Sequence, residues 1–299
     1  MQVVAADRWG QGHFFEVLRR LSWPFPVLFM EDRPWPNNTC LRTMINNKHP
    51  GSSLFSYTGV GRRNDCKGPL FQAFTRWLRD LFPDVMSDSR KAAPCLNVTL
   101  PPGVRDPLAP RDQGRFIPKR PLVRNVVWMS RRDFEAMHLA EHPLSSWQSQ
   151  RIIDNEPDLV AALHKAVLEW NARACFRQHS RKTIPAGETC RDSLLAFEFK
   201  DLEPFDAPLF PDQLSALGQA SVLVGLHGAA LANTYWMEPG KGAVIEILHN
   251  VPGQYHYDNM ARWLGHTYQA VSCGGSSVKI EQAVAALKAA MDDVATRVK

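Results

Sequence analysis

The segment Val222-Leu223-Val224-Gly225-Leu226-His227-Gly228-Ala229-Ala230-Leu231-Ala232-Asn233 decides how the second half of the chain folds. Its first five residues are apolar and predict a buried strand, and the small residues after them predict a tight turn into a helix. Such a turn lets an anion approach the backbone, where unpaired N–H groups and the helix dipole stabilise negative charge. Plain packing of strand against helix is the alternative interpretation. The spacing is not G-x-G-x-x-G, so a dinucleotide-dependent enzyme has little support.

The sequence around this segment alternates strands with helices. Strands are predicted at 126–129, 194–199, 222–226 and 243–248, and helices from about Glu156, over 211–220 and over 257–264. This alternation favours βαβ units around a parallel sheet of at least four strands. The second half is therefore expected to form a Rossmann-like α/β domain.

A proline-rich segment divides the chain. Six prolines stand between Pro101 and Pro121, and proline cannot continue a helix or a central strand. We therefore predict an N-terminal domain over residues 1–115, a C-terminal domain over 120–272 and an amphipathic helix over 278–298. In the first half, an apolar stripe over 70–82 predicts a helix, and the apolar residues 27–30 predict a short strand.

Composition is that of an ordinary globular protein. The 299 residues are 44% hydrophobic and 22% charged, which excludes a disordered, collagen-like or coiled-coil chain. A net charge of +5 is too small to indicate a nucleic-acid partner. No apolar run is long enough to span a membrane, and no signal-peptide pattern follows Met1. Glycosylation sequons at Asn37 and Asn97 keep a secretory protein open. The chain has no C-x-x-C pair and no D-x-D pair, so no metal site is predicted.

One carboxylate, Glu246, interrupts the apolar strand at 243–248. If it lies near the carboxyl end of that strand, it faces the crevice where open α/β sheets bind ligands. Its oxygens could then accept hydrogen bonds from two ribose hydroxyls. An acid at an exposed sheet edge is the alternative. The turn before this strand is predicted from Glu238-Pro239-Gly240-Lys241-Gly242.

Five segments of the second half stand in a distinctive order and spacing. They are Met129-Ser130-Arg131-Arg132, Arg151-Ile152-Ile153-Asp154-Asn155-Glu156, the residues 225–233, Glu238-Pro239-Gly240 and Val244-Ile245-Glu246-Ile247. Together they resemble glycosyltransferase family 61, over about residues 120–272. That family includes plant β-1,2-xylosyltransferases, xylan arabinosyl- and xylosyltransferases, and animal enzymes that add N-acetylglucosamine to EGF domains or to O-mannose.

The resemblance implies a GT-B fold, in which two Rossmann-like domains face a cleft, here with a short N-terminal domain. It implies inverting transfer of a xylose, N-acetylglucosamine or arabinose type of sugar from a UDP-sugar to a hydroxyl of a glycan or glycoprotein. No cofactor and no essential metal are expected. The implied location is the lumen of the secretory pathway, in the Golgi or endoplasmic reticulum. Any membrane attachment is expected through an anchor that this chain lacks.

The resemblance also implies which residues hold the donor. Arg131 or Arg132 would follow the first strand of the domain and pair with the diphosphate, a task suited to a guanidinium fork. A surface pair of basic residues is the alternative for these arginines. The phosphates would meet His227, Gly228 and Ala229, and the ribose would meet Glu246.

In the first half the resemblance rests on residues 9–15 and suggests the catalytic base. An inverting displacement needs a group that takes the proton of the acceptor hydroxyl, and we predict His13 for this role. The family usually shows an asparagine three positions before this histidine, where this chain has Gly10. Glu31 and Asp32 are the second candidates, and a purely structural role is the alternative for His13. The alternative function is a catalytically degenerate member that binds a nucleotide sugar or glycan without transfer.

Overall fold

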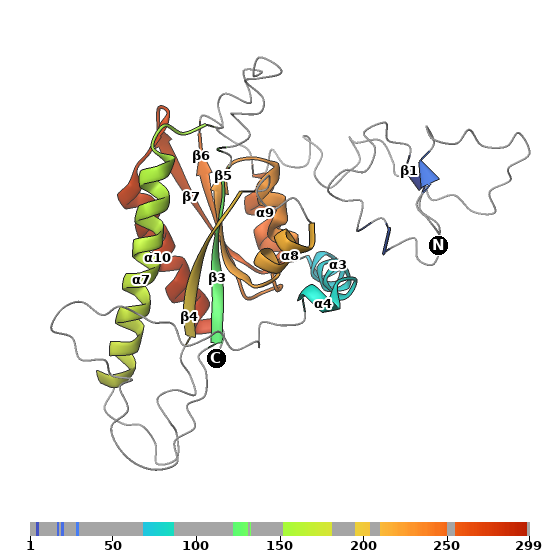
Figure 1. Ribbon diagram of the computed structural model, residues 1–299, viewed down its shortest axis with the longest axis horizontal. Helices are drawn as coiled ribbons and strands as arrows, with labels where there is room; N and C mark the ends of the chain where they lie inside the picture. Colours follow the sequence, from blue (N-terminus) through green and yellow to red (C-terminus); the bar gives the residue numbers. More distant parts are fainter. Residues whose placement is uncertain are drawn as a thin grey trace, which may run out of the picture.

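A six-stranded, mostly parallel sheet forms the centre of the computed structural model (Figure 1). The structure describes residues 4–5, 17, 19–20, 28–29, 68–86, 122–130, 132, 152–180, 195–203, 210–249 and 255–297. The strand order is β4-β3-β5-β6-β7-β8, in which the first five strands are parallel and β8 is antiparallel to β7. The strands are β3 (Leu122–Met129), β4 (Leu195–Leu202), β5 (Ala220–Leu226), β6 (Ala243–Leu248), β7 (Thr267–Gly274) and β8 (Ser277–Val278).

Helices cover both faces of the sheet. On one face lie α7 (Glu156–Ser180) and α10 (Ile280–Arg297), whose apolar side chains form one core with alternate residues of the strands. On the other face lie α8 (Phe210–Gly218), the 3₁₀ helix η2 (Ala229–Trp236) and α9 (His256–Leu264). All seven residues of β5 are buried because both faces are covered, which explains why its sequence is a continuous apolar run rather than an alternating one.

The predicted α/β class and the four predicted strands are confirmed. The helices predicted near Glu156, over 211–220, over 257–264 and at the end of the chain are confirmed as α7, α8, α9 and α10. Strand β7 was not predicted, because its sequence contains no apolar run and only Val271 of the strand is buried, next to the short β8. The α-helix expected after Gly228 is a 3₁₀ helix, in which the N–H of Leu231 already bonds to the carbonyl of Gly228.

The first half of the chain contributes two helices to the core of the sheet domain. The helix predicted over 70–82 is confirmed as α3 (Pro69–Asp80), which is followed by the short α4 (Pro83–Met86). Leu78, Phe82 and Met86 are buried in the same core as α8, η2 and β5. Residues 69–86 therefore pack as part of the layer that covers the sheet, although they precede the proline-rich segment. The domain division at about residue 115 stays a prediction.

Elsewhere in the first half, β1 (Val4–Ala5) and β2 (Leu28–Phe29) form a small parallel pair. The second of these lies within the strand predicted at 27–30. Within the described ranges, no helix combines the length and the apolar character that crossing a bilayer requires.

Candidate functional site

The carboxyl ends of β3 and β5 define a switch point in the sheet. Strand β4 pairs with one side of β3, and β5 pairs with the other. The connection that follows β3 packs on one face through α7, whereas the connection that follows β5 packs on the other face through η2. In open α/β sheets, ligands bind outside the carboxyl ends of the strands at such a point. The residues at this point are Ser130 and Arg132 after β3, and His227 and Gly228 after β5.

The turn after β5 depends on glycine. Gly228 adopts φ 151° and ψ 177°, a backbone region that is almost restricted to glycine. The backbone N–H of His227 still pairs with the carbonyl of Ile247 at 2.9 Å, so the chain leaves the sheet only at Gly228. Within the described part of the chain, no side chain caps the start of η2. The first N–H groups of η2, beginning at Ala229, are therefore not used by a capping side chain, as an anion site requires.

His227 is held by Glu246 from the neighbouring strand β6. The Nδ1 of His227 lies in hydrogen-bond contact with one carboxylate oxygen of Glu246, and the hydroxyl of Tyr268 on β7 donates to the other. The Glu246 side chain is fully buried, with 0% of its surface exposed. Both oxygens of this carboxylate are thus engaged inside the protein, which satisfies the requirement that a buried charge be paired.

Aromatic side chains of α9 surround the His227 ring. The ring of Tyr257 lies edge-on to it at 5.3 Å between centroids, and that of His256 lies at 6.1 Å. Burial is the main cause that lowers the pKa of His256; the nearby His227 lowers it further, and Glu246 partly opposes the shift. The Nδ1 atom of His256 is buried and has no hydrogen-bond partner among the residues that the structure describes. This end of the sheet therefore carries a group of imidazole and phenol side chains around one carboxylate.

A second buried carboxylate, Glu156, organises the end of β3. Glu156 begins α7 and accepts hydrogen bonds from the indole N–H of Trp128 at 2.9 Å and from the hydroxyl of Ser130 at 2.8 Å. The Nε of Arg132 lies 3.9 Å from the same carboxylate, and its guanidinium bonds to Asp201 at the end of β4. The bond to Asp201 is the main cause that raises the pKa of Arg132. With 40% of its side chain exposed, Arg132 lies at the surface beside the switch point.

The structure brings some predicted site residues together and leaves others aside. It places His227 and Glu246 in direct contact, with Gly228 and Ala229 next in the chain. Arg132 lies at the adjacent strand end but turns toward Asp201. Four predicted residues lie outside the described residues: Arg131, His13, Glu31 and Asp32. The roles predicted for all of these residues stay predictions.

Sequence reasoning missed three residues of this site. Glu156 looks like a helix-start acid, and nothing in the sequence shows that it accepts bonds from Trp128 and Ser130. Tyr268 lies on the strand that was not predicted, and Asp201 is one acid among many. The signal that could have found Glu156 is its position in the segment 151–156, one of the five segments that resemble family 61.

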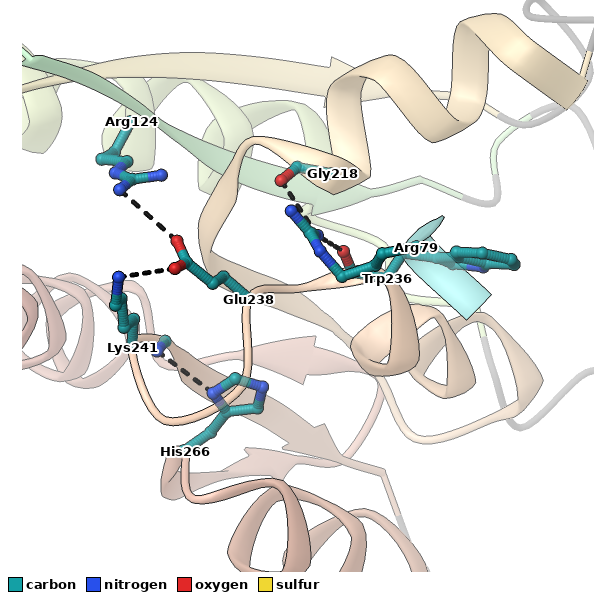
Figure 2. A network of polar contacts seen from close by, with 8 residues as sticks. Arg79, Arg124, Gly218, Trp236, Glu238, Lys241 and His266 are labelled. Carbon is teal, nitrogen blue, oxygen red and sulfur yellow. Dashed lines mark hydrogen bonds and ion pairs between the residues drawn. The ribbon is translucent and has the colours of Figure 1, made fainter. Parts of the chain in front are cut away.

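The Glu238-Pro239-Gly240 turn lies at the opposite end of the sheet, at the amino ends of the parallel strands, just before β6 begins. Glu238 lies between Arg124, at 3.6 Å, and Lys241, at 2.5 Å, as Figure 2 shows. Burial alone would raise the pKa of Glu238, but the bond from Lys241 and the charges of the nearby basic residues hold it below its ordinary value. This turn thus has a structural explanation away from the switch point.

Arg79 of α3 connects the first half of the chain to this end of the sheet through hydrogen bonds. Its guanidinium donates to the carbonyl of Gly218 at 3.2 Å and to that of Trp236 (Figure 2). These carbonyls end α8 and η2, where the helix dipole favours a cation. Burial is the main cause that lowers the pKa of Arg79. Nearby, the N–H of Gly242 donates to His266 Nδ1 at 3.1 Å.

The family model described as Glycosyltransferase 61 matches residues 12–244. The match covers more than half of the chain and extends into the first half, where the sequence alone carried a thinner resemblance. The chain therefore belongs to glycosyltransferase family 61.

Two plant proteins are similar to part of the chain. One is the β-1,2-xylosyltransferase RCN11 of Oryza sativa subsp. japonica, 23% identical over 160 residues, which are 54% of this chain and 24% of the rice protein. The other is a β-1,2-xylosyltransferase of Arabidopsis thaliana, 27% identical over 154 residues, which are 52% of this chain and 24% of that protein. The aligned part therefore spans about a quarter of the length of these relatives.

Proposed function

We propose that this protein is an inverting glycosyltransferase that moves a sugar from a UDP-sugar to a hydroxyl of a glycan or glycoprotein. The observation that carries the proposal is the switch point, where the glycine turn after β5 lies beside the end of β3 in a chain of family 61. A sugar of xylose type is favoured by the names of the two similar plant proteins. The proposal includes a GT-B arrangement and a location in the lumen of the Golgi or endoplasmic reticulum.

In this proposal the donor's diphosphate binds across the two strand ends. The backbone at Gly228 and Ala229 donates to phosphate oxygens, and His227 adds a ring nitrogen. Arg131 or Arg132 neutralises the diphosphate, and Arg132 would exchange its bond to Asp201 for one to phosphate. For the ribose contact predicted for Glu246, the carboxylate must give up its hydrogen bond to His227 or Tyr268.

The chemistry is a single displacement at the anomeric carbon. The acceptor oxygen forms a bond to that carbon from the face opposite the diphosphate, while the bond from carbon to the phosphate oxygen breaks. The acceptor proton passes to a base, for which His13 is the first candidate and Glu31 or Asp32 the second. The leaving UDP gains negative charge, which fixed arginines and backbone N–H groups stabilise without a required metal ion.

The test is the thermal stability of the purified full chain with UDP, GDP, CMP or ADP, each without and with Mn²⁺. A ligand that binds only the folded state raises the unfolding midpoint, and we expect UDP to do so selectively and without metal. Arg131→Ala should reduce that shift. Lys288→Ala is the matched control, because it removes a positive charge that pairs with Glu169 on the face covered by α7 and α10. No shift with any nucleotide would contradict the donor site.

The alternative function is binding without transfer, by a degenerate family member. A chain that binds UDP but transfers no sugar from UDP-xylose, UDP-N-acetylglucosamine or UDP-arabinose to a panel of glycan acceptors would favour it. In that outcome, hydrolysis of the donor by water is the further measurement, because it reports a working donor site without an acceptor.

A further inference from the structure

Arg132, at the switch point, is bonded to a carboxylate of the protein itself. Its guanidinium donates to Asp201 on β4, and its Nε lies 3.9 Å from the carboxylate of Glu156. Within the described part of the chain, Asp201 has no other hydrogen-bond partner. Arg132 can therefore leave Asp201 without breaking any further contact of that carboxylate.

The order of the strands places this bond on the side of β3 that faces away from the glycine turn. Strand β4 pairs with one side of β3 and β5 with the other, and Asp201 is the register partner of Trp128 near the end of β3. Gly228 follows β5. Neighbouring strands lie about 4.8 Å apart, so β4 and β5 are separated by roughly 10 Å. Asp201 thus draws the guanidinium of Arg132 away from the turn at Gly228.

The two carboxylates near Arg132 differ in how firmly they are held. Glu156 is 6% exposed, and one of its oxygens accepts hydrogen bonds from Trp128 and Ser130. The pair of Arg132 and Asp201 lies at the surface, with 40% and 28% of the two side chains exposed. Exposed ion pairs contribute little free energy because water screens them. Glu156 is therefore a fixed acceptor at the end of β3, whereas the bond to Asp201 can open at low cost.

A diphosphate at the glycine turn would compete with Asp201 for the same guanidinium. Arginine binds carboxylate and phosphate through the same fork of N–H donors, and a diphosphate carries more negative charge than one carboxylate. When the guanidinium moves to the phosphates, Asp201 is left as a negative charge near a negative ligand, and like charges repel. The carboxylate therefore opposes binding of the diphosphate in two ways: it holds the cation, and it repels the anion.

We propose that Asp201 is a positioning residue that holds Arg132 away from the donor site and exchanges it with the diphosphate of the donor. UDP, the product of transfer, then binds less tightly than it would bind beside an Arg132 without this partner. The inference rests on the proposed function, because it takes the ligand to be a nucleoside diphosphate. It goes further by giving Asp201, a residue that the sequence did not single out, control over the affinity of the site.

The first test measures UDP binding to the full chain by titration calorimetry. Asp201→Asn keeps the shape of the side chain and removes its charge, so UDP should bind about fivefold more tightly, a factor within the range that an exposed ion pair contributes. Glu198→Gln is the matched control, because it removes a carboxylate of the same strand that pairs with Lys200, and it should leave UDP affinity unchanged. Weaker binding in Asp201→Asn would show that Asp201 holds Arg132 inside the site, and unchanged binding would show no competition. Either result would overturn the proposal.

The second test asks whether Asp201 acts through Arg132. Loss of a negative charge near a diphosphate can strengthen binding through space alone, so Asp201→Asn is also measured in the Arg132→Gln background. The exchange predicts a larger gain in the wild-type background, because only there must UDP separate Arg132 from Asp201. Equal gains in the two backgrounds would reduce the effect to repulsion and overturn the positioning role.

Inorganic pyrophosphate separates this inference from the proposed function, because it carries the charges of a diphosphate without a nucleoside. If pyrophosphate binds more tightly to Asp201→Asn in the same Arg132-dependent way while UDP does not bind, the exchange stands and the nucleotide-sugar donor fails. If UDP binds equally to the wild-type chain and to Asp201→Asn, the donor site stands and the exchange fails. If neither anion binds to either chain, both proposals fail. Should Asp201→Asn not fold, Asp201→Ser removes the same charge and carries the same expectations.

Discussion

Phe82 links the first half of the chain to the sheet domain, and its truncation should destabilise the whole domain. Its side chain is fully buried, at 0% exposure, among residues of α8, η2 and β5. Its ring meets that of Trp236 edge-on at 5.8 Å, and the guanidinium of Arg20 lies over it at 4.3 Å. Phe82→Ala therefore removes a complete core side chain and a ring pair.

The expected loss is about 4 kcal/mol, because truncation of a buried phenylalanine typically costs about 3 to 5 kcal/mol including the cavity. The ring pair accounts for about 1 kcal/mol of this. Such a loss should lower the thermal midpoint by roughly 10 °C in a domain of this size. Phe74→Ala is the matched control: it is the same substitution on α3, but Phe74 is 45% exposed, so its loss should stay below about 1 kcal/mol.

The measurement is urea unfolding followed by circular dichroism, together with amide hydrogen exchange in β5. If residues 69–86 belong to the sheet domain, Phe82→Ala should shift the single unfolding transition and speed exchange in β5. Equal losses in the two variants, or a separate transition with exchange in β5 unchanged, would show that the helices do not share the core and would refute the reasoning.

Three further predictions concern positions near the two ends of the strands. Burial lowers the pKa of His266 from 6.5 to about 3, so between pH 6.5 and pH 3 the unfolded chain binds a proton that the folded chain does not. The free energy of unfolding should therefore fall as the pH falls below 6.5, by about 3 kcal/mol at pH 4. Urea unfolding of His266→Gln should show a smaller loss of stability over this pH range. Gly265 and Gly275 have φ of +79° and +73°, but of these two only Gly265 would place a Cβ against backbone, 3.2 Å from Gly240 Cα. Thermal unfolding should therefore show a stability loss of about 1 kcal/mol in Gly275→Ala and a larger loss in Gly265→Ala. Equal stability losses would contradict the close approach at Gly265. Gly228→Ala should lose UDP stabilisation in the nucleotide panel, because its φ of 151° is strained for alanine, and an undiminished UDP shift would remove the turn from the donor site.

Much of the sheet domain could be predicted because its signals are local. The apolar runs that became β3, β5 and β6 are buried on both faces, and their lengths and flanking turns indicate strands without knowledge of their neighbours. Strand β7 carries no such run, because its position near the edge leaves most of its side chains partly exposed. Its place in the sheet comes from pairing with β6, which local sequence does not encode.

The packing of α3 was beyond prediction for a different reason. The amphipathic stripe correctly indicated the helix but not the surface that it covers. Arg79 shows the difficulty: at sequence level it is one more basic residue at the end of a helix, whereas in the fold it binds carbonyls that are 139 and 157 residues away in the chain. A proline-rich segment between these partners favoured a boundary, although the helix and the sheet share one core.

The candidate site separates what local sequence can predict from what only the fold can. The glycine turn was recognisable because its requirement is local: β5 ends at Leu226, and two residues later Gly228 adopts a conformation that glycine tolerates. Glu246 was recognisable as a charged residue in an apolar strand, which requires a partner. Its partners lie 19 residues before it and 22 residues after it in the chain. One of those partners lies on the strand that was not predicted, so the sequence left a ligand as the natural partner for the carboxylate. Once Tyr268 takes one oxygen and His227 the other, the buried charge is paired within the protein.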